Sequence, residues 1–504
     1  MARRFSLPLS GQHQHGMQKE TLRLIFGLKI HLLRQQRGLT LHQLAEKTGT
    51  VVSYLHDIEK GKKYPSSDKI MALAAALDSS YDALVALGGM KQLQPIIDLL
   101  ESEFFKTYPL ELFGLKPEKI LELLSDDPSR VSAFVSAMLK ISRSYHLRRE
   151  SLYSVAVRSY QDMHDNYFPQ IETAARDFRI AHSAFFENKR NDTAVAMEQA
   201  LLQVYNIRVD RTALPKQTEL RRIRSYFNPD ERILHLNAGF SPAQERFLLA
   251  REIGFQALGL TVRPYETIIQ QAEHFDKLLH NFHASYFASA LLMPPEALAE
   301  DIRRCAGQLE WNPAEWLDLL ERYQVTPEML LQRFTNVLPG LFGLKDLFFL
   351  RLEGNETLNH FTMTKELHLS GQQSPYATEN GHYCRRWVSV EILRELRVRG
   401  KQQVLAMAQI SSYYQTDNEY CVISMAKPSY RNAKTGVSVT LGLRLTDDLR
   451  RLFKFVGDPA LIRKTVGSTC ETCALPDCES RAAAPVELER EAELVQVMQA
   501  LKRL

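Results

Sequence analysis

The pattern of apolar and polar positions predicts a small helical domain near the N-terminus. Apolar residues recur at helical spacing over 22–87, and the turn signals RGLT, KTGT and KGKKYPSS interrupt them. Thr40 is placed to cap a helix, and Gly49 supplies the turn before a second helix at about 51–59. The pattern therefore predicts about five short helices, two of them joined by a tight turn.

The pattern changes several times along the rest of the chain. Helical periodicity continues to about residue 200, with a helix that begins or is interrupted near Pro169, and short alternating strands follow. Helices return from Ser241, and after Leu341 most segments read as strands, with a helix at 388–400. The fold class is multi-domain and mainly α. The predicted segments are a flexible leader at 1–19, an all-α domain at 20–88, a helical spacer or dimerisation region at 89–200, an α+β segment at 201–340, an α/β domain at 341–485 and a C-terminal helix at 486–504.

Composition supports several globular domains. The chain has 504 residues, of which 45% are apolar and 24% are charged. It has no apolar run long enough to span a membrane, and its start lacks the apolar region of a secretory signal, so a cytoplasmic location is expected. The net charge is +4, and residues 20–70 alone hold nine Lys or Arg against five Asp or Glu. This local excess favours a partner with negative charge.

The stretch LTLHQLAEKTGTVVSYLHDIEKGKKYPSSDKIMALAAAL resembles the lambda-repressor-like DNA-binding family. The resemblance implies a helix-turn-helix that binds a near-palindromic double-stranded operator as a dimer or higher homo-oligomer. Because Leu41, Val51 and Val52 stand where the family often has polar residues, base readout is expected to use thymine methyl groups more than bidentate hydrogen bonds. The resemblance places these residues at the DNA: Thr40, Thr50, Val51, Val52, Ser53, Tyr54, His56, Lys60, Lys62 and Lys63.

The stretch RFLLAREIGFQALG, residues 246–259, looks like a metalloprotease helix without its metal ligands. A zinc hydrolase helix needs two histidines four positions apart and a glutamate beside the first. With NFHASYFASALLMPP about 30 residues later, the order resembles the IrrE/ImmA metallopeptidase-like family. The matching positions are Arg251, Glu252, Phe255 and Asn281, so only the general base is kept.

These substitutions predict a catalytically inactive fold. Arginine stays protonated, phenylalanine offers no lone pair, and one amide oxygen holds a metal poorly. His274, His280 and His283 lie nearby but outside the matching positions, and His164 is interpreted as structural. Glu252 is expected to be a surface or bridging carboxylate, paired with Arg251 or another base.

Three cysteines fall close together in CETCALPDCESRA, at Cys470, Cys473 and Cys478. Such spacing suits a metal or an iron–sulfur cluster but supplies one ligand fewer than four. The alternatives are a [4Fe-4S] cluster, structural zinc, or unliganded reduced thiols. Cys305 and Cys421 are interpreted as core or surface cysteines.

The order of these segments resembles the short-chain fatty acyl transcriptional regulators, over about residues 20–485. The resemblance implies a GAF-like C-terminal domain that senses acyl-CoA, and a cluster to which Cys384 of GHYCRRW contributes. Many members have a further cysteine where this chain has Leu443, which puts full ligation in doubt. Candidate contacts to an acyl-CoA effector follow Cys384; an exposed basic turn is the alternative. These candidates are Arg385, Arg386 and Trp387.

Three functions are considered. The first is a DNA-binding transcriptional regulator that responds to a short-chain acyl-CoA or related metabolite, and is not an enzyme. The second is a DNA-associated IrrE/ImmA-type zinc peptidase that cleaves a partner repressor, against which the missing ligands argue. The third is a scaffold or antitoxin-like protein, which a separate sensor-like domain with a cysteine loop disfavours.

Overall fold

The structure is a computed structural model. It describes residues 13–86, 90, 93, 149–186, 193–220, 223–263, 275–355, 357–369, 381–399, 404–429 and 435–501. Residues 1–12 of the expected leader, residues 94–148 of the expected spacer, and His274 lie outside the described residues. Two compact units form, one of residues 1–160 with 268–279, the other of residues 161–267 with 280–504. None of the described helices is long and apolar enough to cross a membrane.

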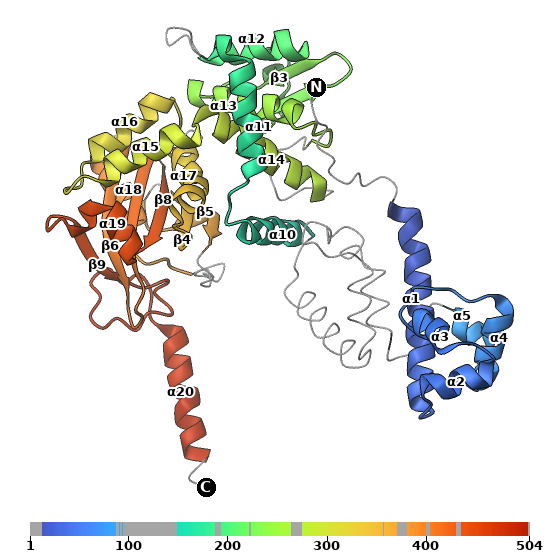
Figure 1. Ribbon diagram of the computed structural model, residues 1–504. Helices are drawn as coiled ribbons and strands as arrows, with labels where there is room; N and C mark the ends of the chain where they lie inside the picture. The colour runs from blue at the N-terminus through green and yellow to red at the C-terminus, as the bar shows by residue number, and fades with distance from the viewer. Residues whose placement is uncertain are drawn as a thin grey trace. The chain divides into compact units, whose positions relative to one another are not determined.

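The N-terminal domain of the first unit is a bundle of five helices, at the blue end of Figure 1. They are α1 (His13–Gln36), α2 (Leu41–Thr48), α3 (Val52–Glu59), α4 (Ser67–Ala76) and α5 (Tyr81–Val85). Helix α1 begins at His13, inside the segment expected to be a loose leader, so that part of the prediction is wrong. The sequence did not predict this first part of the helix, because Gln, His and Gly near the start give no apolar periodicity.

Helix α1 packs closely on α3. A Cβ atom at Gly27 would lie 2.2 Å from the carbonyl oxygen of Ile58, so no other residue fits there without moving the backbone. Phe26 and Ile30 of α1 join Leu55 and Ile58 of α3 in one buried cluster. The bundle therefore fixes α3 against a long helix while leaving its opposite face exposed.

The second unit begins with the segment that resembles a metallopeptidase. Helix α11 starts at Pro169, as expected, since proline is tolerated in a first helical turn. A three-stranded sheet has the order β1-β3-β2, with β1 parallel to β3 and β2 antiparallel to it. The first unit also contains most of α10 (Arg149–Met163) and the start of α14 (Phe275–Leu292). The other helices and strands up to residue 342 belong to the second unit: α11 (Pro169–Ala181), α12 (Thr193–Tyr205), β1 (Arg208–Asp210), β2 (Ser225–Asn228), β3 (Ile233–Leu236), α13 (Pro242–Ala257), α15 (Pro295–Ala306), α16 (Pro313–Tyr323) and α17 (Pro327–Phe342).

The C-terminal part contains a six-stranded sheet of order β5-β4-β8-β7-β6-β9. All neighbours pair antiparallel except β6 and β9, which are parallel, so the sheet is mixed. The strands expected after Leu341 and the helix at 388–400 are confirmed. The elements are β4 (Leu347–Gly354), β5 (Phe361–His368), α18 (Val388–Arg399), β6 (Leu405–Tyr413), β7 (Glu419–Pro428), β8 (Gly436–Arg444), α19 (Asp447–Leu452), β9 (Ile462–Val466) and α20 (Val486–Leu501).

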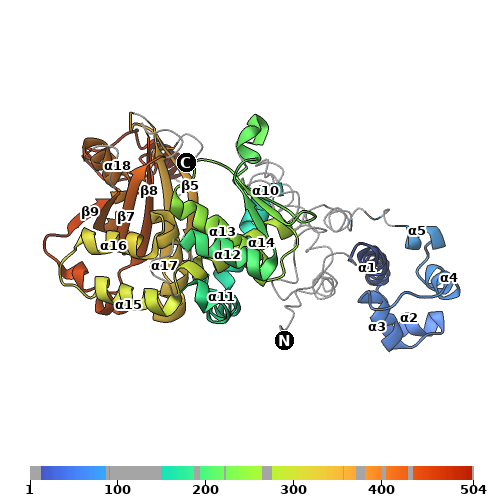
Figure 2. The ribbon, with the colours of Figure 1, turned by 90° about the horizontal axis from the view of Figure 1, so that it is seen from above.

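Helices cover both faces of this sheet (Figure 2). Helix α18 covers one face, and α16 and α17 contact the other. Trp316 of α16 is 1% exposed, with ring centroids 6.2 Å from Phe453 and 6.0 Å from Phe455. Glu328 at the start of α17 binds Lys365 Nζ at 2.6 Å.

The expected boundary at 340 therefore does not separate two independent domains, because α16 and α17 also form a layer of the C-terminal sheet. The boundary at 200 likewise falls within α12, which packs on α13. Sequence periodicity shows that a helix is amphipathic, but it does not show which sheet or helix its apolar face covers. The GAF-like assignment stays a prediction.

Candidate functional site

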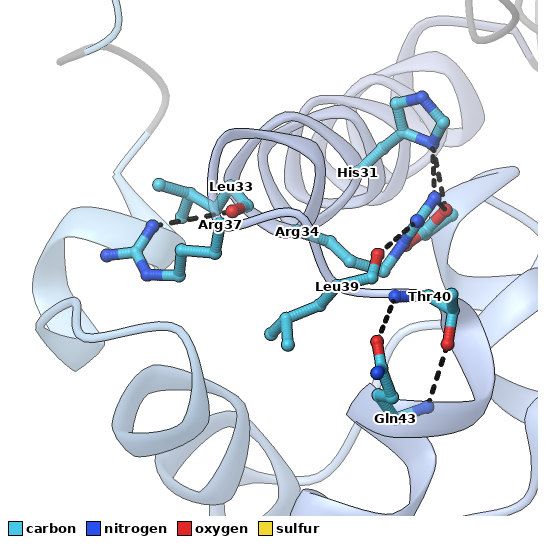
Figure 3. Close-up of polar contacts among 8 residues, drawn as sticks. His31, Leu33, Arg34, Arg37, Leu39, Thr40 and Gln43 are labelled. Atoms are coloured by element: carbon cyan, nitrogen blue, oxygen red, sulfur yellow. Dashed lines mark hydrogen bonds and ion pairs between the residues drawn. The ribbon is translucent and has the colours of Figure 1, made fainter.

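A complete capping box starts the first helix of the helix-turn-helix (Figure 3). The Gln43 backbone N–H donates to Thr40 Oγ1 at 3.2 Å, and the Thr40 N–H donates to Gln43 Oε1 at 2.8 Å. Gly49 ends the helix with φ of 58°, a left-handed conformation that favours glycine. The sequence prediction for this turn is thus confirmed, and the Thr40 hydroxyl is engaged in the cap.

The exposed surface at the start of α3 is unusually apolar. Val51 and Val52 are 66% and 39% exposed, and Ser53 and His56 are exposed beside them. The hydroxyl of Thr50 is instead bonded to Thr48 at 2.8 Å. This surface offers methyl groups beside the polar groups of Ser53 and His56, and contact with thymine methyl groups stays a prediction.

The basic residues after α3 differ in their surroundings. Lys62 and Lys63 are exposed, whereas Lys60 is half-buried. Lys63 pairs with Asp57 at 2.8 Å, and this hydrogen bond lowers the pKa of the Asp57 carboxyl. Lys63 also lies 5.7 Å from the ring centroid of Tyr54. Part of the positive charge expected to meet phosphates is therefore already compensated within the domain.

A buried carboxylate holds α3 in place. Glu59, 4% exposed, accepts from Arg34 Nε at 2.6 Å and Arg34 Nη2 at 2.9 Å, and lies 2.8 Å from His31 Nδ1. These contacts connect the end of α3 to His31 and Arg34 of α1, which are labelled in Figure 3. Sequence reasoning missed Glu59, because a charged residue at a helix end is usually solvated.

The degenerate metal positions come together in the second unit. Arg251 Nη1 donates to Asn281 Oδ1 at 3.3 Å, and Arg251 Nη2 donates to Ser225 Oγ at 2.8 Å. Burial lowers the pKa of Arg251 to about 10, so the guanidinium keeps its charge near neutral pH. A fixed side-chain cation therefore contacts the position of the expected third metal ligand.

Glu252 is not a surface carboxylate. It is 4% exposed, forms an ion pair with Arg263, and accepts from Gln256 Nε2 at 2.8 Å. Arg263 also stacks over Phe255 at 4.6 Å from the ring centroid. Burial raises the pKa of Glu252, while these partners act against that shift. The bridging interpretation is correct, but the partner is Arg263 instead of Arg251.

The nearby histidines do not rebuild a metal site. His283 is 6% exposed, and burial lowers its pKa to about 4. His280 Nδ1 lies 3.1 Å from the carbonyl oxygen of Val262, and His164 lies against Phe168 with ring centroids 5.1 Å apart. Over the described ranges, no three His, Cys, Asp or Glu side chains are arranged to hold one metal ion.

Four cysteines from two distant segments line one pocket in the C-terminal part. The pocket is lined by Cys384, Arg385, Arg386, Gly467, Thr469, Cys470, Cys473, Leu475, Cys478, Ser480 and Arg481. Backbone pairing brings the segments together: Tyr383 bridges Thr469, Cys384 N–H donates to Ser468 O at 3.1 Å, and Cys470 N–H donates to His382 O at 2.8 Å. Cys384 thus joins the other three, as the family resemblance implied.

Backbone groups and one arginine fix the thiols. The Gly467 N–H donates to Cys384 Sγ at 3.4 Å, and the Ala482 N–H donates to Cys470 Sγ at 3.3 Å. Arg481 donates to the carbonyl oxygens of Cys470 and two other loop residues, at 2.6–3.2 Å. A Cβ atom at Gly467 would lie 2.7 Å from Cys473 Sγ. Gly467 therefore lets the backbone lie against the Cys473 sulfur, where a side chain would not fit.

The residues after Cys384 do not form an exposed basic turn. Arg385 is 6% exposed and Trp387 is 5% exposed. The Trp387 indole N–H donates to Gly467 O at 2.9 Å, so this ring supports the cysteine pocket. Trp387 also lines a second small hollow between α18 and the sheet, together with Phe348, Leu350, Val388, Ser389, Ser411, Tyr413, Val422 and Thr440.

The remaining cysteines and Leu443 lie away from this pocket. Cys305 is 2% exposed and Cys421 fully buried, so both are core residues, and burial raises their pKa values to about 11 and about 12. Leu443 on β8 pairs in register with Cys421 and is not one of the residues that line the cysteine pocket. The Leu443 substitution therefore removes no ligand from the four-cysteine set.

Comparison with known proteins matches two parts of this arrangement. Residues 30–84 match the helix-turn-helix family model. The chain carries a helix-turn-helix domain. Residues 203–335 match the IrrE N-terminal-like domain, in agreement with the resemblance seen in the sequence.

Similarity to individual proteins extends further. The chain is 20% identical over 489 residues to the HTH-type transcriptional regulator RamB of Mycobacterium tuberculosis, covering 90% of this chain and 94% of RamB. Over 59 residues it is 42% identical to the immunity repressor protein of Bacillus phage phi105, covering 12% of this chain and 41% of the repressor. A solved Mycobacterium tuberculosis transcriptional regulator aligns with a TM-score of 0.46 at 15% identity, over 65% of this chain and 92% of that one.

Proposed function

We propose that this protein is a DNA-binding transcriptional regulator that acts in the cytoplasm as a homodimer or higher homo-oligomer on a near-palindromic operator. The observation that carries the proposal is α3, which Glu59 holds against α1 while Val51, Val52 and Ser53 stay exposed at its start. The similarity to RamB over most of both chains supports the same conclusion. A dimer places two such helices one helical turn of DNA apart.

DNA binding is tested with the full chain and duplexes that it selects from a random library. Val52→Ser should weaken binding to selected duplexes and relax base preference at contacted thymines, since it removes methyl contacts. Met71→Ser, which changes an exposed apolar residue of α4, is the matched control and should bind like the original protein. Selection that yields no enriched sequence would refute sequence-specific recognition.

The salt dependence and the assembly state give two further tests. Lys62→Gln should reduce the slope of log affinity against log salt by about one if Lys62 contacts a phosphate. Mass photometry of the complex should show two or more copies per selected duplex. One copy per duplex with full affinity would contradict the dimeric arrangement.

We propose further that the C-terminal part senses a short-chain acyl-CoA or related metabolite. The hollow beneath α18 is lined by apolar side chains and by the hydroxyl residues Ser389, Ser411 and Thr440, a lining that suits the short acyl end of such a ligand. It has room for about one water molecule, so it must open to admit the acyl group, and the phosphates of CoA would stay outside it. Because Trp387 lines this hollow and is bonded to Gly467, a ligand there would also act on the cysteine loop. Operator binding measured with and without a panel of acyl-CoAs tests this, and no response to any of them would remove the effector proposal.

We propose that the cysteine pocket holds an iron–sulfur cluster in preference to a single zinc ion. Four thiolates on one zinc lie about 2.3 Å from a common point, and among the described residues no group of three ligands has that arrangement. Thiolates that each bind a different iron surround a larger space, and all four cysteines line the same pocket. Cys384, Cys470, Cys473 and Cys478 would hold a [4Fe-4S] cluster, and the cluster would supply one-electron redox chemistry.

The cluster is tested on anaerobically purified full-length protein by iron, sulfide and zinc analysis and by absorbance near about 400 nm. Cys473→Ser should lose the iron and the absorbance. Cys305→Ala, at a core cysteine away from the pocket, should keep both. A colourless protein that contains one zinc ion would refute the cluster and support a structural zinc site. A protein without metal would refute both and support reduced, unliganded thiols.

We propose that the IrrE-like segment is not a peptidase. Arg251 contacts Asn281, and Glu252 is engaged with Arg263, so neither a metal ligand nor a water-activating base is available at the matching positions. Peptide cleavage by the zinc-soaked protein, with Glu252→Gln as comparison, is the test. Zinc-dependent cleavage that disappears in Glu252→Gln would restore the peptidase function.

A further inference from the structure

The cysteine pocket contains cations but no carboxylate. Three arginines, Arg385, Arg386 and Arg481, line it together with the four cysteines. The Arg481 guanidinium is bonded to backbone carbonyl oxygens of the loop. Arg385 Nη1 and Arg386 Nε are buried, and neither has a hydrogen-bond partner among the residues that the structure describes. Two donors on consecutive residues therefore remain unsatisfied at the same pocket.

Arg385 is also held rigidly. Its side chain is 94% buried, Nη2 donates to Asn359 O at 2.5 Å, and the guanidinium lies 4.5 Å from the ring centroid of Phe361. Its charge interacts with the sulfur groups of Cys470 and Cys384 and, as a smaller contribution, with the carboxylate of Glu471, although these two side chains, both in the described part of the chain, form no ion pair. A fixed, buried cation that is not ion-paired with a carboxylate is costly unless an anion accompanies it.

We infer that Arg385, assisted by Arg386, is the charge-compensating group of the cysteine pocket and favours the reduced form of the cluster held there. The inference rests on the cluster proposed above. Arg385 is not a ligand, and it acts through its charge on the thiolate-bound group. The pocket thereby selects an anionic occupant and sets the potential at which that occupant accepts an electron.

The direction of the effect follows from charge. Four thiolates around the oxidised [4Fe-4S] core make a dianion, and one electron from an external donor makes it a trianion. A neighbouring cation stabilises the trianion more than the dianion, so it raises the midpoint potential. At an effective dielectric constant of about 20, a unit charge within about 10 Å changes the equilibrium more than tenfold.

The test is a redox titration of the anaerobically purified full chain with dithionite, followed by electron paramagnetic resonance of the reduced cluster. Arg385→Gln should lower the ratio of reduced to oxidised cluster at least about tenfold at a fixed potential, a shift of about 59 mV to more negative values for one electron. Arg385→Lys, which keeps the charge, should titrate close to the original protein. Arg399→Gln is the control, because Arg399 is exposed and pairs with Glu395, also on α18. The midpoint potential should not shift in this variant.

The outcomes separate the two proposals. If the original protein contains no iron and no sulfide, the proposed cluster is refuted. A cluster with the same midpoint in Arg385→Gln as in the original protein would overturn the role of Arg385 and leave the cluster standing. If Arg385→Gln does not retain a cluster, Arg386→Gln replaces it: a negative shift there supports the inference, and an unchanged midpoint refutes it.

Discussion

Replacing Glu59 by glutamine should loosen the recognition helix without changing its sequence-reading surface. The side chains of Glu59 and Arg34 are 6% and 12% exposed, and they form a two-bond ion pair. Breaking a buried pair costs about 3–5 kcal/mol. Because Arg34 keeps its bond to Leu39 O at 2.9 Å and glutamine still offers an oxygen, we expect a loss of about 2–3 kcal/mol in the free energy of opening α3.

Hydrogen exchange of the full-length chain measures this loss. A change of about 2–3 kcal/mol corresponds to exchange about 30- to 150-fold faster at the amides of α3. Glu46→Gln is the matched control, because Glu46 on α2 is 68% exposed and pairs only loosely with His42, at 3.5 Å. Equal exchange in the two variants would refute the reasoning.

The same contact predicts a dependence on pH. Burial alone raises the pKa of Glu59, but hydrogen bonds from His31 and Arg34 outweigh it and leave the pKa below its usual value. The folded pKa is thus lower than the unfolded one, about 4.3, so the stabilisation is complete above that pH and is lost as pH falls through the folded pKa. The difference between the original protein and Glu59→Gln should accordingly shrink in acid.

Three further substitutions have defined outcomes. Gly467→Ala should reduce the iron content, because its Cβ would lie 2.7 Å from Cys473 Sγ; normal iron content would show that the loop adjusts. Glu172→Gln should destabilise the second unit by about 3–5 kcal/mol in denaturant unfolding, since it leaves the fully buried Arg333 without its carboxylate, and a loss below about 1 kcal/mol would contradict this. Thr40→Ala should cost about 1 kcal/mol in the exchange of α2, and no change would mean that the cap is dispensable.

Features set by local chemistry were predictable from the sequence. Capping by Thr40, the turn at Gly49 and the strands from residue 346 onward depend on neighbours a few positions away, and the structure has them. The partner of Glu252 was not predictable, because Arg263 lies beyond the end of α13 and reaches back to it. Such a contact depends on the path of the chain after the helix.

The convergence of the cysteines shows the same limit. Spacing alone grouped Cys470, Cys473 and Cys478, whereas Cys384 joined them only through family resemblance. The physical reason for the convergence is the pairing of Tyr383 with Thr469, which joins segments more than 80 residues apart in the sequence. Arg385 and Arg386 beside them were expected to contact an acyl-CoA or to form an exposed basic turn. The second of these alternatives fails because Arg385 is buried, whereas a run of two arginines is usually solvated.

Helices α16 and α17 each pack in two parts of the protein, and this limits which sequence changes the fold can tolerate. Both helices belong largely to the IrrE-like segment, and both also form a face of the C-terminal sheet. The IrrE-like segment therefore has a structural role that does not depend on hydrolysis. Its deletion would remove Trp316 and its neighbours and leave the sheet uncovered. We therefore expect single residues of the segment to tolerate substitution far better than the whole segment tolerates deletion.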